Sequence, residues 1–171
     1  MKRILILAAL AIVLLGGGYY YYRNQDQQLI NRQVDVLIEN IEHKKISLRK
    51  PSDVEKAIRE VMTDQVLFHG SFPVPRGELS VDDVLERLST FHGLTTSCEI
   101  RESDRKVLIK ENEAQVTIDA EIAVAAGKNL SRKEKWTMVF TLSKSDVWRI
   151  SGVKGIPPNG ATSDEDAEGL F

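Results

Sequence analysis

Two histidines and one aspartate of this sequence have the side-chain types that general acid–base chemistry uses: His69, His92 and Asp64. An imidazole titrates near neutral pH, and a nearby carboxylate can orient the ring and stabilise its charged form. His69 follows a short apolar run and His92 ends a predicted helix, so both could reach the mouth of a pocket. No spacing requires the three to meet, and the simpler interpretation gives each a structural or surface role.

The other residues that could carry chemistry point to structure instead. His43 stands with two lysines at a predicted helix end, where positive charge is favourable. Cys98 is the only cysteine, so it cannot form an internal disulfide, and its usual role is that of a small buried side chain. No histidine pair has metal-ligand spacing and no glycine-rich phosphate loop is present, so we expect neither a metal nor a cofactor.

Asp119 and Glu121 lie two positions apart in a run that alternates apolar and polar side chains. Paired carboxylates could suggest glycoside hydrolysis. Their face of the predicted strand is opposite to that of Val116 and Ile118, because successive side chains of a strand point to opposite sides. We therefore predict that both carboxylates face solvent, opposite basic side chains of a neighbouring strand.

Large apolar side chains are the candidates for a ligand-binding site. They alternate along one predicted strand and recur at the start of the next: Trp136, Met138, Phe140 and Trp148. Such residues could line a cavity for a small apolar ligand. They could equally form the core, an interpretation favoured by the large area that aromatic side chains bury.

The charge composition limits the kinds of partner that this protein can bind. The chain has 171 residues with 23 basic and 25 acidic side chains, giving a net charge of −2. This balance provides no long-range attraction to a polyanion, so we exclude a nucleic-acid partner. The length beyond a membrane segment suits one ordinary domain, large enough to bury a core without disulfides.

The N-terminal residues form the clearest feature of the sequence. Lys2 and Arg3 precede an uncharged run over residues 4–22, which as a helix would span about 28 Å and so cross the hydrocarbon core of a bilayer. The positive-inside rule keeps the N-terminus in the cytoplasm and places the domain on the periplasmic or extracellular side. The alternative is a cleaved signal peptide, with Gly16 and Gly18 before the cut, which leaves the domain in the same compartment.

The rest of the chain predicts one α+β domain. Apolar residues recur at helical spacing in three segments: 26–45, 52–65 and 80–91. After a short strand at 66–68 and a loop at 69–79, the period changes to two beyond Gly93, and strands follow: 95–109, broken near Ser103, then 114–124, 136–142 and 147–156. Helices on one face of an antiparallel sheet define the α+β class.

We therefore divide the chain into three parts. Residues 1–23 form a membrane anchor, residues 24–156 form the domain, and residues 157–171 form an acidic tail that we expect to be disordered.

This order of elements resembles the nuclear-transport-factor-2-like superfamily, which includes SnoaL-like polyketide cyclases and ketosteroid isomerase. Three segments carry the resemblance: the strand, loop and helix over 66–91, the hairpin start at 111–116, and the ending at 142–150 with its Trp148-Arg149-Ile150 triplet. It covers about residues 26–156. It implies a cone-like curved antiparallel sheet packed on about three N-terminal helices, here preceded by one transmembrane helix. A cystatin-like domain with a different number of helices is the nearest alternative.

The resemblance also bears on activity. Catalytic members of the superfamily line their cone with tyrosine, aspartate or histidine, and ketosteroid isomerase uses a tyrosine in its oxyanion hole. Here all four tyrosines lie at positions 19–22, outside the predicted domain, so a site of that kind is excluded.

The hypothesis that this inventory favours is a non-catalytic envelope module held at the membrane through residues 4–22. Such a module would bind a protein partner or a second copy of itself, and it resembles in arrangement the inner-membrane assembly factors of type IV secretion, without their diagnostic motifs. The alternatives are a binding domain for a small apolar ligand and an enzyme of the cyclase or isomerase type.

Overall fold

The computed structural model describes residues 24–44, 50–70, 75–127 and 130–158. The predicted anchor, residues 1–23, and all but the start of the predicted tail, residues 159–171, lie outside these ranges. Within them, no helix has both the length and the apolar character needed to cross a membrane.

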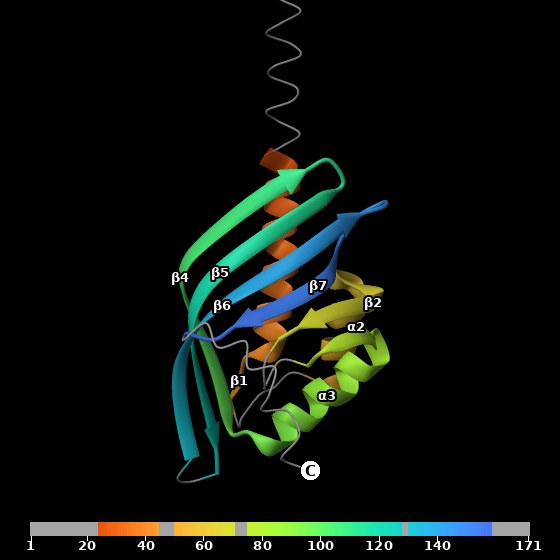
Figure 1. Cartoon of the computed structure of the whole chain (residues 1–171). Helices are drawn as coiled ribbons and strands as arrows, with labels where there is room; N and C mark the ends of the chain where they lie inside the picture. The colour runs from red at the N-terminus through yellow and green to blue at the C-terminus, as the bar shows by residue number, and fades with distance from the viewer. Residues whose placement is uncertain (1–23, 45–49, 71–74, 128–129, 159–171) are drawn as a thin grey trace, which may run out of the picture.

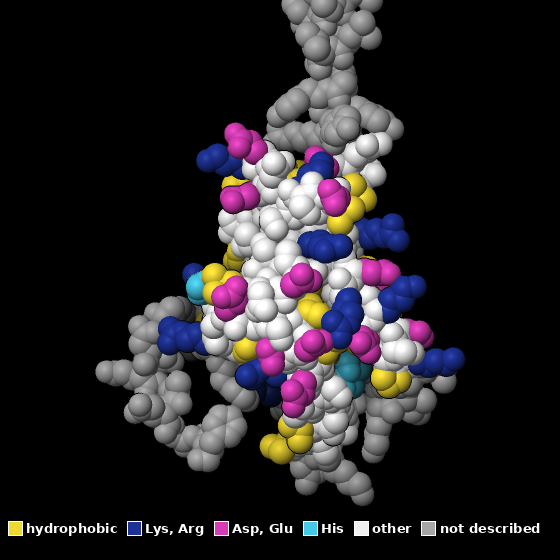
Figure 2. All heavy atoms as spheres, turned by 90° about the vertical axis from the view of Figure 1, so that its right-hand side faces the viewer, with side chains coloured by type: hydrophobic (Ala, Val, Ile, Leu, Met, Phe, Trp, Pro, Cys, Tyr) yellow, Lys and Arg dark blue, Asp and Glu magenta, His cyan; other side chains and the backbone are white. Residues whose placement is uncertain are grey.

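Helices lie on one side of a single curved sheet, which confirms the α+β class (Figure 1). A helix over residues 24–41 comes first. The elements after it are β1 (His43–Lys44), α2 (Pro51–Val61), β2 (Met62–His69), β3 (Gly77–Ser80), α3 (Val81–Leu94), β4 (Ser97–Lys110), β5 (Glu113–Ala126), β6 (Leu130–Lys144) and β7 (Trp148–Ile156). The sheet order is β1-β4-β5-β6-β7-β2-β3. On the face that Figure 2 turns to the viewer, basic and acidic side chains are interspersed.

Several sequence predictions need correction. The sheet is not wholly antiparallel, because β2 runs parallel to β7. The second helix, predicted over 52–65, is shorter: α2 begins at Pro51, with Lys50 as N-cap and no side-chain cap, and ends at Val61. The segment predicted as a loop over 69–79 ends in β3, an edge strand paired with β2. The predicted start of the third helix near residue 80 is confirmed, and there Ser80 and Asp83 form a capping box.

The helix over residues 24–41 fills the concave side of the sheet. Its apolar stripe was predicted from spacing, and Ile30 and Val34 are fully buried, with Leu37 and Ile38 nearly so. They belong to one continuous core with the inward side chains of the sheet, among them Phe140. The helix therefore packs directly against the concave side of the sheet.

A bulge in β4 ties the sheet edge to this helix. The register shifts between Glu102 and Asp104, as the predicted break near Ser103 implied. Above the bulge Arg105 takes an inward position opposite Ile118. Its guanidinium lies 2.6 Å from a carboxylate oxygen of Asp35 on the helix and also pairs with Glu102. The bulge thus directs the Arg105 guanidinium towards the helix.

The start of the same helix is bound to the strands β6 and β7. Asp26 Oδ1 accepts hydrogen bonds from Lys144 Nζ and from Trp148 Nε1, both at 2.8 Å. The Lys144 ammonium also lies 5.5 Å from the centroid of the Trp148 ring. Burial opposes the charged carboxylate, but the two hydrogen bonds outweigh it and hold the pKa of Asp26 below its ordinary value of 3.8.

Replacing Asp26 with alanine should lower the free energy of unfolding by about 1.5–3 kcal/mol at neutral pH, because two hydrogen bonds to a charged group are lost. The folded-state pKa is depressed, so this stabilisation is present at neutral pH and disappears as the pH falls through that pKa. Urea unfolding of the full chain at several pH values measures both effects. Asp146→Ala, in the exposed turn between β6 and β7, is the control, and an equal loss there would contradict the assignment.

Candidate functional site

The structure separates the three residues proposed for acid–base chemistry. Asp64 and His69 are exposed side chains of β2, and His69 pairs with Lys154 of β7. His92 lies half-buried in the last turn of α3. Among the described residues, no hydrogen bond or ring contact joins His92 to Asp64 or His69. The partner of His92 is another histidine.

His43 and His92 form a close pair. Their ring centroids are 4.3 Å apart, with the planes inclined by 44°. The edge of the His43 ring also meets Phe91, with centroids 5.7 Å apart. The pair joins β1 to the end of α3 beside the last turn of the helix 24–41.

The hydrogen bonds indicate how each ring is protonated. The Thr95 hydroxyl donates to the Phe91 carbonyl at 2.6 Å, so its oxygen is left to accept from His43 Nε2, 2.9 Å away. His92 Nε2 lies 3.3 Å from the Ile41 carbonyl oxygen, which can only accept. The contact of His92 thus favours a proton on its Nε2, whereas His43 has an acceptor at each ring nitrogen, because its Nδ1 lies 3.5 Å from the Ile41 carbonyl oxygen.

His92 has an environment that disfavours its charged form. Burial lowers the pKa of His92 below its ordinary value of 6.5, and the neighbouring His43 lowers it further. The carbonyls of Ile41 and Asn40 act in the opposite direction but do not reverse the shift.

Cys98 adds neither a nucleophile nor a counter-charge to this pair. It is the strand partner of His43, and burial raises the pKa of its thiol to about 11. The thiol is therefore neutral at physiological pH. The nearby Glu42 uses its carboxylate to accept the Ile100 N–H at 2.7 Å. Within the described part of the chain, no carboxylate is hydrogen bonded to either imidazole, so the pair lacks the usual partner of a catalytic base.

The four candidate ligand-binding side chains divide into two groups. Met138, Phe140 and Trp148 belong to the continuous core. Trp136 is also buried, at 8% exposure, but lies outside that core. The four residues before it in β6, 132–135, are all charged, which sets it apart from the other three.

Trp136 lies in a part of β6 that extends past β7. The last pairing of β7 joins Ile156 to Thr137, and two prolines follow, so the predicted end of the sheet is confirmed. Residues 130–136 of β6 are paired with β5 but with no other strand of the described chain. We call this segment the overhang, and it forms the lower part of the β5–β6 hairpin in Figure 1.

The concave side of the overhang combines apolar and charged side chains. Register places Val124 beside Arg132 and Ile122 beside Glu134, next to Trp136. Trp136 Nε1 donates to Glu134 Oε2 at 3.2 Å, and the Arg132 guanidinium lies 2.6 Å from Glu134 Oε1. Ile122 and Val124 are only half-buried. We call these five residues the overhang surface.

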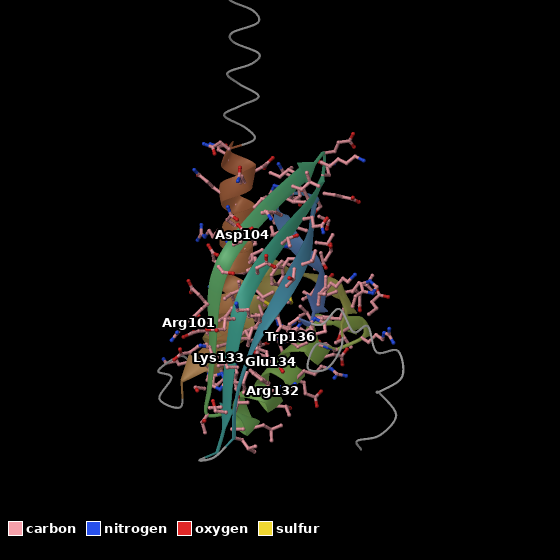
Figure 3. All side chains as sticks on the ribbon, turned by 60° about the vertical axis from the view of Figure 1, so that its left-hand side comes forward. Arg101, Asp104, Arg132, Lys133, Glu134 and Trp136 are labelled. Carbon is pink, nitrogen blue, oxygen red and sulfur yellow. The ribbon has the colours of Figure 1, made fainter. Side chains whose placement is uncertain are left out.

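Figure 3 shows the two sides of this segment: Arg132, Glu134 and Trp136 lie on one side of β6, and Lys133 lies on the other, as does Arg101 of β4. On this convex side, Glu121 pairs with Lys133 at 2.8 Å and Asp119 accepts from the Thr137 hydroxyl at 2.6 Å. The prediction that both carboxylates lie opposite the apolar face is confirmed, and so is a basic partner for Glu121. The convex face is thus polar here, and the charge of Glu121 is neutralised by Lys133.

Sequence reasoning missed His43, Arg132 and Glu134. His43 was assigned to a helix terminus, and no local signal links it to α3. Arg132 and Glu134 could have been found, because extending the alternation back from Trp136 places both on the concave face.

Solved structures share this fold. A nuclear-transport-factor-2-like superfamily protein from Salmonella enterica serovar Typhimurium is 15% identical, with a TM-score of 0.63 over 86% of this chain and 99% of its own. A protein from Novosphingobium aromaticivorans described as having a cystatin-like fold is 10% identical, with a TM-score of 0.64 over 87% and 92%.

An enzyme is among the similar structures. A hexachlorocyclohexane dehydrochlorinase from Novosphingobium barchaimii is 10% identical, with a TM-score of 0.64 over 80% of this chain and 88% of its own. No family model and no curated protein matches the sequence. At these identities the likeness shows the fold alone: the domain has the nuclear-transport-factor-2-like fold, as the sequence resemblance implied.

Proposed function

We propose that this protein is a non-catalytic binding module, held at a membrane through residues 4–22 with its domain outside the cytoplasm, and that it recognises a protein partner through the overhang surface. The observation that carries the proposal is the filled cone. Ile30, Val34 and Leu37 occupy the concave side of the sheet, where a ligand would otherwise lie.

The inventory of polar groups supports a non-catalytic role. Asn40 is the only buried polar residue among those described, and its side-chain amide donates to the Val36 carbonyl at 2.7 Å. The half-buried histidines bond to a hydroxyl and a carbonyl rather than to a carboxylate. An elimination like that of a dehydrochlorinase needs a base that a partner group orients next to the substrate. Neither histidine has a carboxylate partner of that kind among the described residues.

The composition of the overhang surface supports a protein partner. Arginine is enriched where protein interfaces carry most of their binding energy, and Arg132 is 74% exposed, whereas Trp136 is buried beneath the surface. Here both lie beside half-buried aliphatic side chains, and Leu130 next to them is 73% exposed. The uncharged run after Lys2 and Arg3 supports the membrane attachment.

Site-specific photo-crosslinking in native membranes tests the proposal. A photoreactive residue at Leu130 of the full chain should give one adduct of defined mass, because this side chain adjoins the overhang surface. Leu108 is the matched control, a leucine 65% exposed at the other end of the sheet on the convex face, and should give none. Equal labelling from both positions would contradict the assigned surface.

Activity measurements test the non-catalytic role. The full chain in nanodiscs should show no turnover on dehydration, dehydrochlorination or ketosteroid-isomerisation substrates. Turnover that His92→Gln abolishes would establish the enzyme alternative instead.

A further inference from the structure

The histidine pair lies where three segments meet: β1, the end of α3, and the last turn of the helix 24–41. β1 and the end of α3 lie towards the end of the domain opposite residue 24 (Figure 1). Ile38 anchors the end of the helix 24–41 in the core, but the other two segments have few buried side chains. β1 contains two residues, which pair with Ser97 and Cys98. In α3 the buried residue is Val81, in the first turn.

Leu88 of α3 packs against the core, but beyond it few contacts hold the C-terminal end of the helix in place. Thr96 N donates to the Ala125 carbonyl at 2.7 Å, which attaches the residues after α3 to β5. His92 attaches the helix itself to the Ile41 carbonyl, and His43 reaches Thr95 from β1. Segments with few buried contacts open locally at the lowest free-energy cost.

We propose that His43 and His92 form an acid-sensitive latch, in which the neutral pair holds the C-terminal end of α3 against the helix 24–41 and protonation of His92 beside His43 releases it. At neutral pH each ring needs only one N–H, and each has an acceptor for it. Two imidazolium rings with centroids 4.3 Å apart would repel each other in a half-buried site.

The carbonyls of Ile41 and Asn40 favour a charged His92 but do not reverse the effect of burial and of His43. The charged groups around the pair add little. From the chain after the helix 24–41, Glu42 is engaged with the Ile100 N–H. From β4, the Cys98 thiol stays neutral and Glu99 pairs with Arg101 at 3.3 Å. On α3, Glu86 and Arg87 lie on earlier turns and are exposed.

The direction of the effect follows from linkage. The folded state binds a proton at His92 less readily than the unfolded chain, because burial and His43 lower the pKa of His92 below 6.5. The local structure is therefore fully stable above that value and loses stability as the pH falls below it. This inference rests on the contacts of the pair and does not require the proposed binding function.

Hydrogen exchange of the full chain in nanodiscs tests the latch. Protection factors, which correct for the intrinsic pH dependence of exchange, should fall about tenfold in residues 88–98 between about pH 7.5 and about pH 5. Those of the central part of β5 and β6 should stay constant. His92→Gln keeps a side-chain N–H near the Ile41 carbonyl but cannot titrate, so its exchange in 88–98 should be independent of pH.

His69→Gln is the matched control, because His69 is an exposed histidine of β2 outside the pair, and this variant should respond to acid like the wild type. If His92→Gln does not fold, His92→Asn provides the same comparison, because it also carries an amide and cannot titrate. The latch is refuted if protection in 88–98 does not change with pH in the wild type. It is also refuted if both His92→Gln and His69→Gln respond like the wild type.

Discussion

Trp148→Ala should lower the free energy of unfolding by about 3–5 kcal/mol, the range for truncating a large aromatic side chain in a core. Trp148 is 1% exposed at the start of β7. Its loss leaves a cavity next to the continuous core and removes one of the two hydrogen bonds that Asp26 accepts. Urea unfolding followed by far-UV circular dichroism measures the change without depending on tryptophan fluorescence.

Two variants separate the contributions to that loss. Trp148→Phe retains much of the packed volume but not the N–H, so it should cost less than the alanine substitution. Val147→Ala, at a neighbouring side chain that is 48% exposed, should change the free energy by no more than about 0.5 kcal/mol. Similar losses for Trp148→Ala and Val147→Ala would mean that β7 packs differently from the structure described.

Leu37→Ala should cost about 2–5 kcal/mol and open an apolar cavity inside the cone. Leu37 is 3% exposed and packs with the core between the helix and the sheet. A cavity lined by aliphatic side chains stays dry and accepts small apolar molecules. We therefore expect benzene to raise the melting temperature of the variant and to leave that of the wild type unchanged.

The matched control for Leu37 lies on the same helix. Leu29 is 47% exposed, so Leu29→Ala should have little effect on stability and should create no benzene site. If benzene stabilised the wild type as strongly as Leu37→Ala, the cone would already contain a cavity. The alternative of a small apolar ligand would then replace the binding of a protein partner.

Local patterns predicted most of the fold. The stripe through Ile30, Val34 and Leu37 identified the helix that fills the cone, because helical spacing is a property of neighbouring residues. The alternation through Val116 and Ile118 likewise predicted which face of β5 is buried. The break at Ser103 could be anticipated because the alternation fails there.

Features that depend on distant partners could not be predicted in this way. Val66 and Phe68 indicate a strand, but nothing near them specifies that it runs parallel to β7. β3 has only four residues and is stabilised by pairing with β2. The contact of His43 with His92 requires the end of one helix to meet β1, and no spacing in the sequence encodes that meeting.

The overhang has a consequence for solubility. Because β7 stops at Ile156, one edge of β6 over residues 130–136 presents backbone N–H and C=O groups that no described strand of the chain pairs with. Such an edge invites strand addition by another molecule and, eventually, aggregation. The run Arg132-Lys133-Glu134-Lys135 counters this, since a second copy that added there parallel and in register would bring like charges close together. The charges beside Trp136 therefore also act as gatekeepers against fibrous self-assembly.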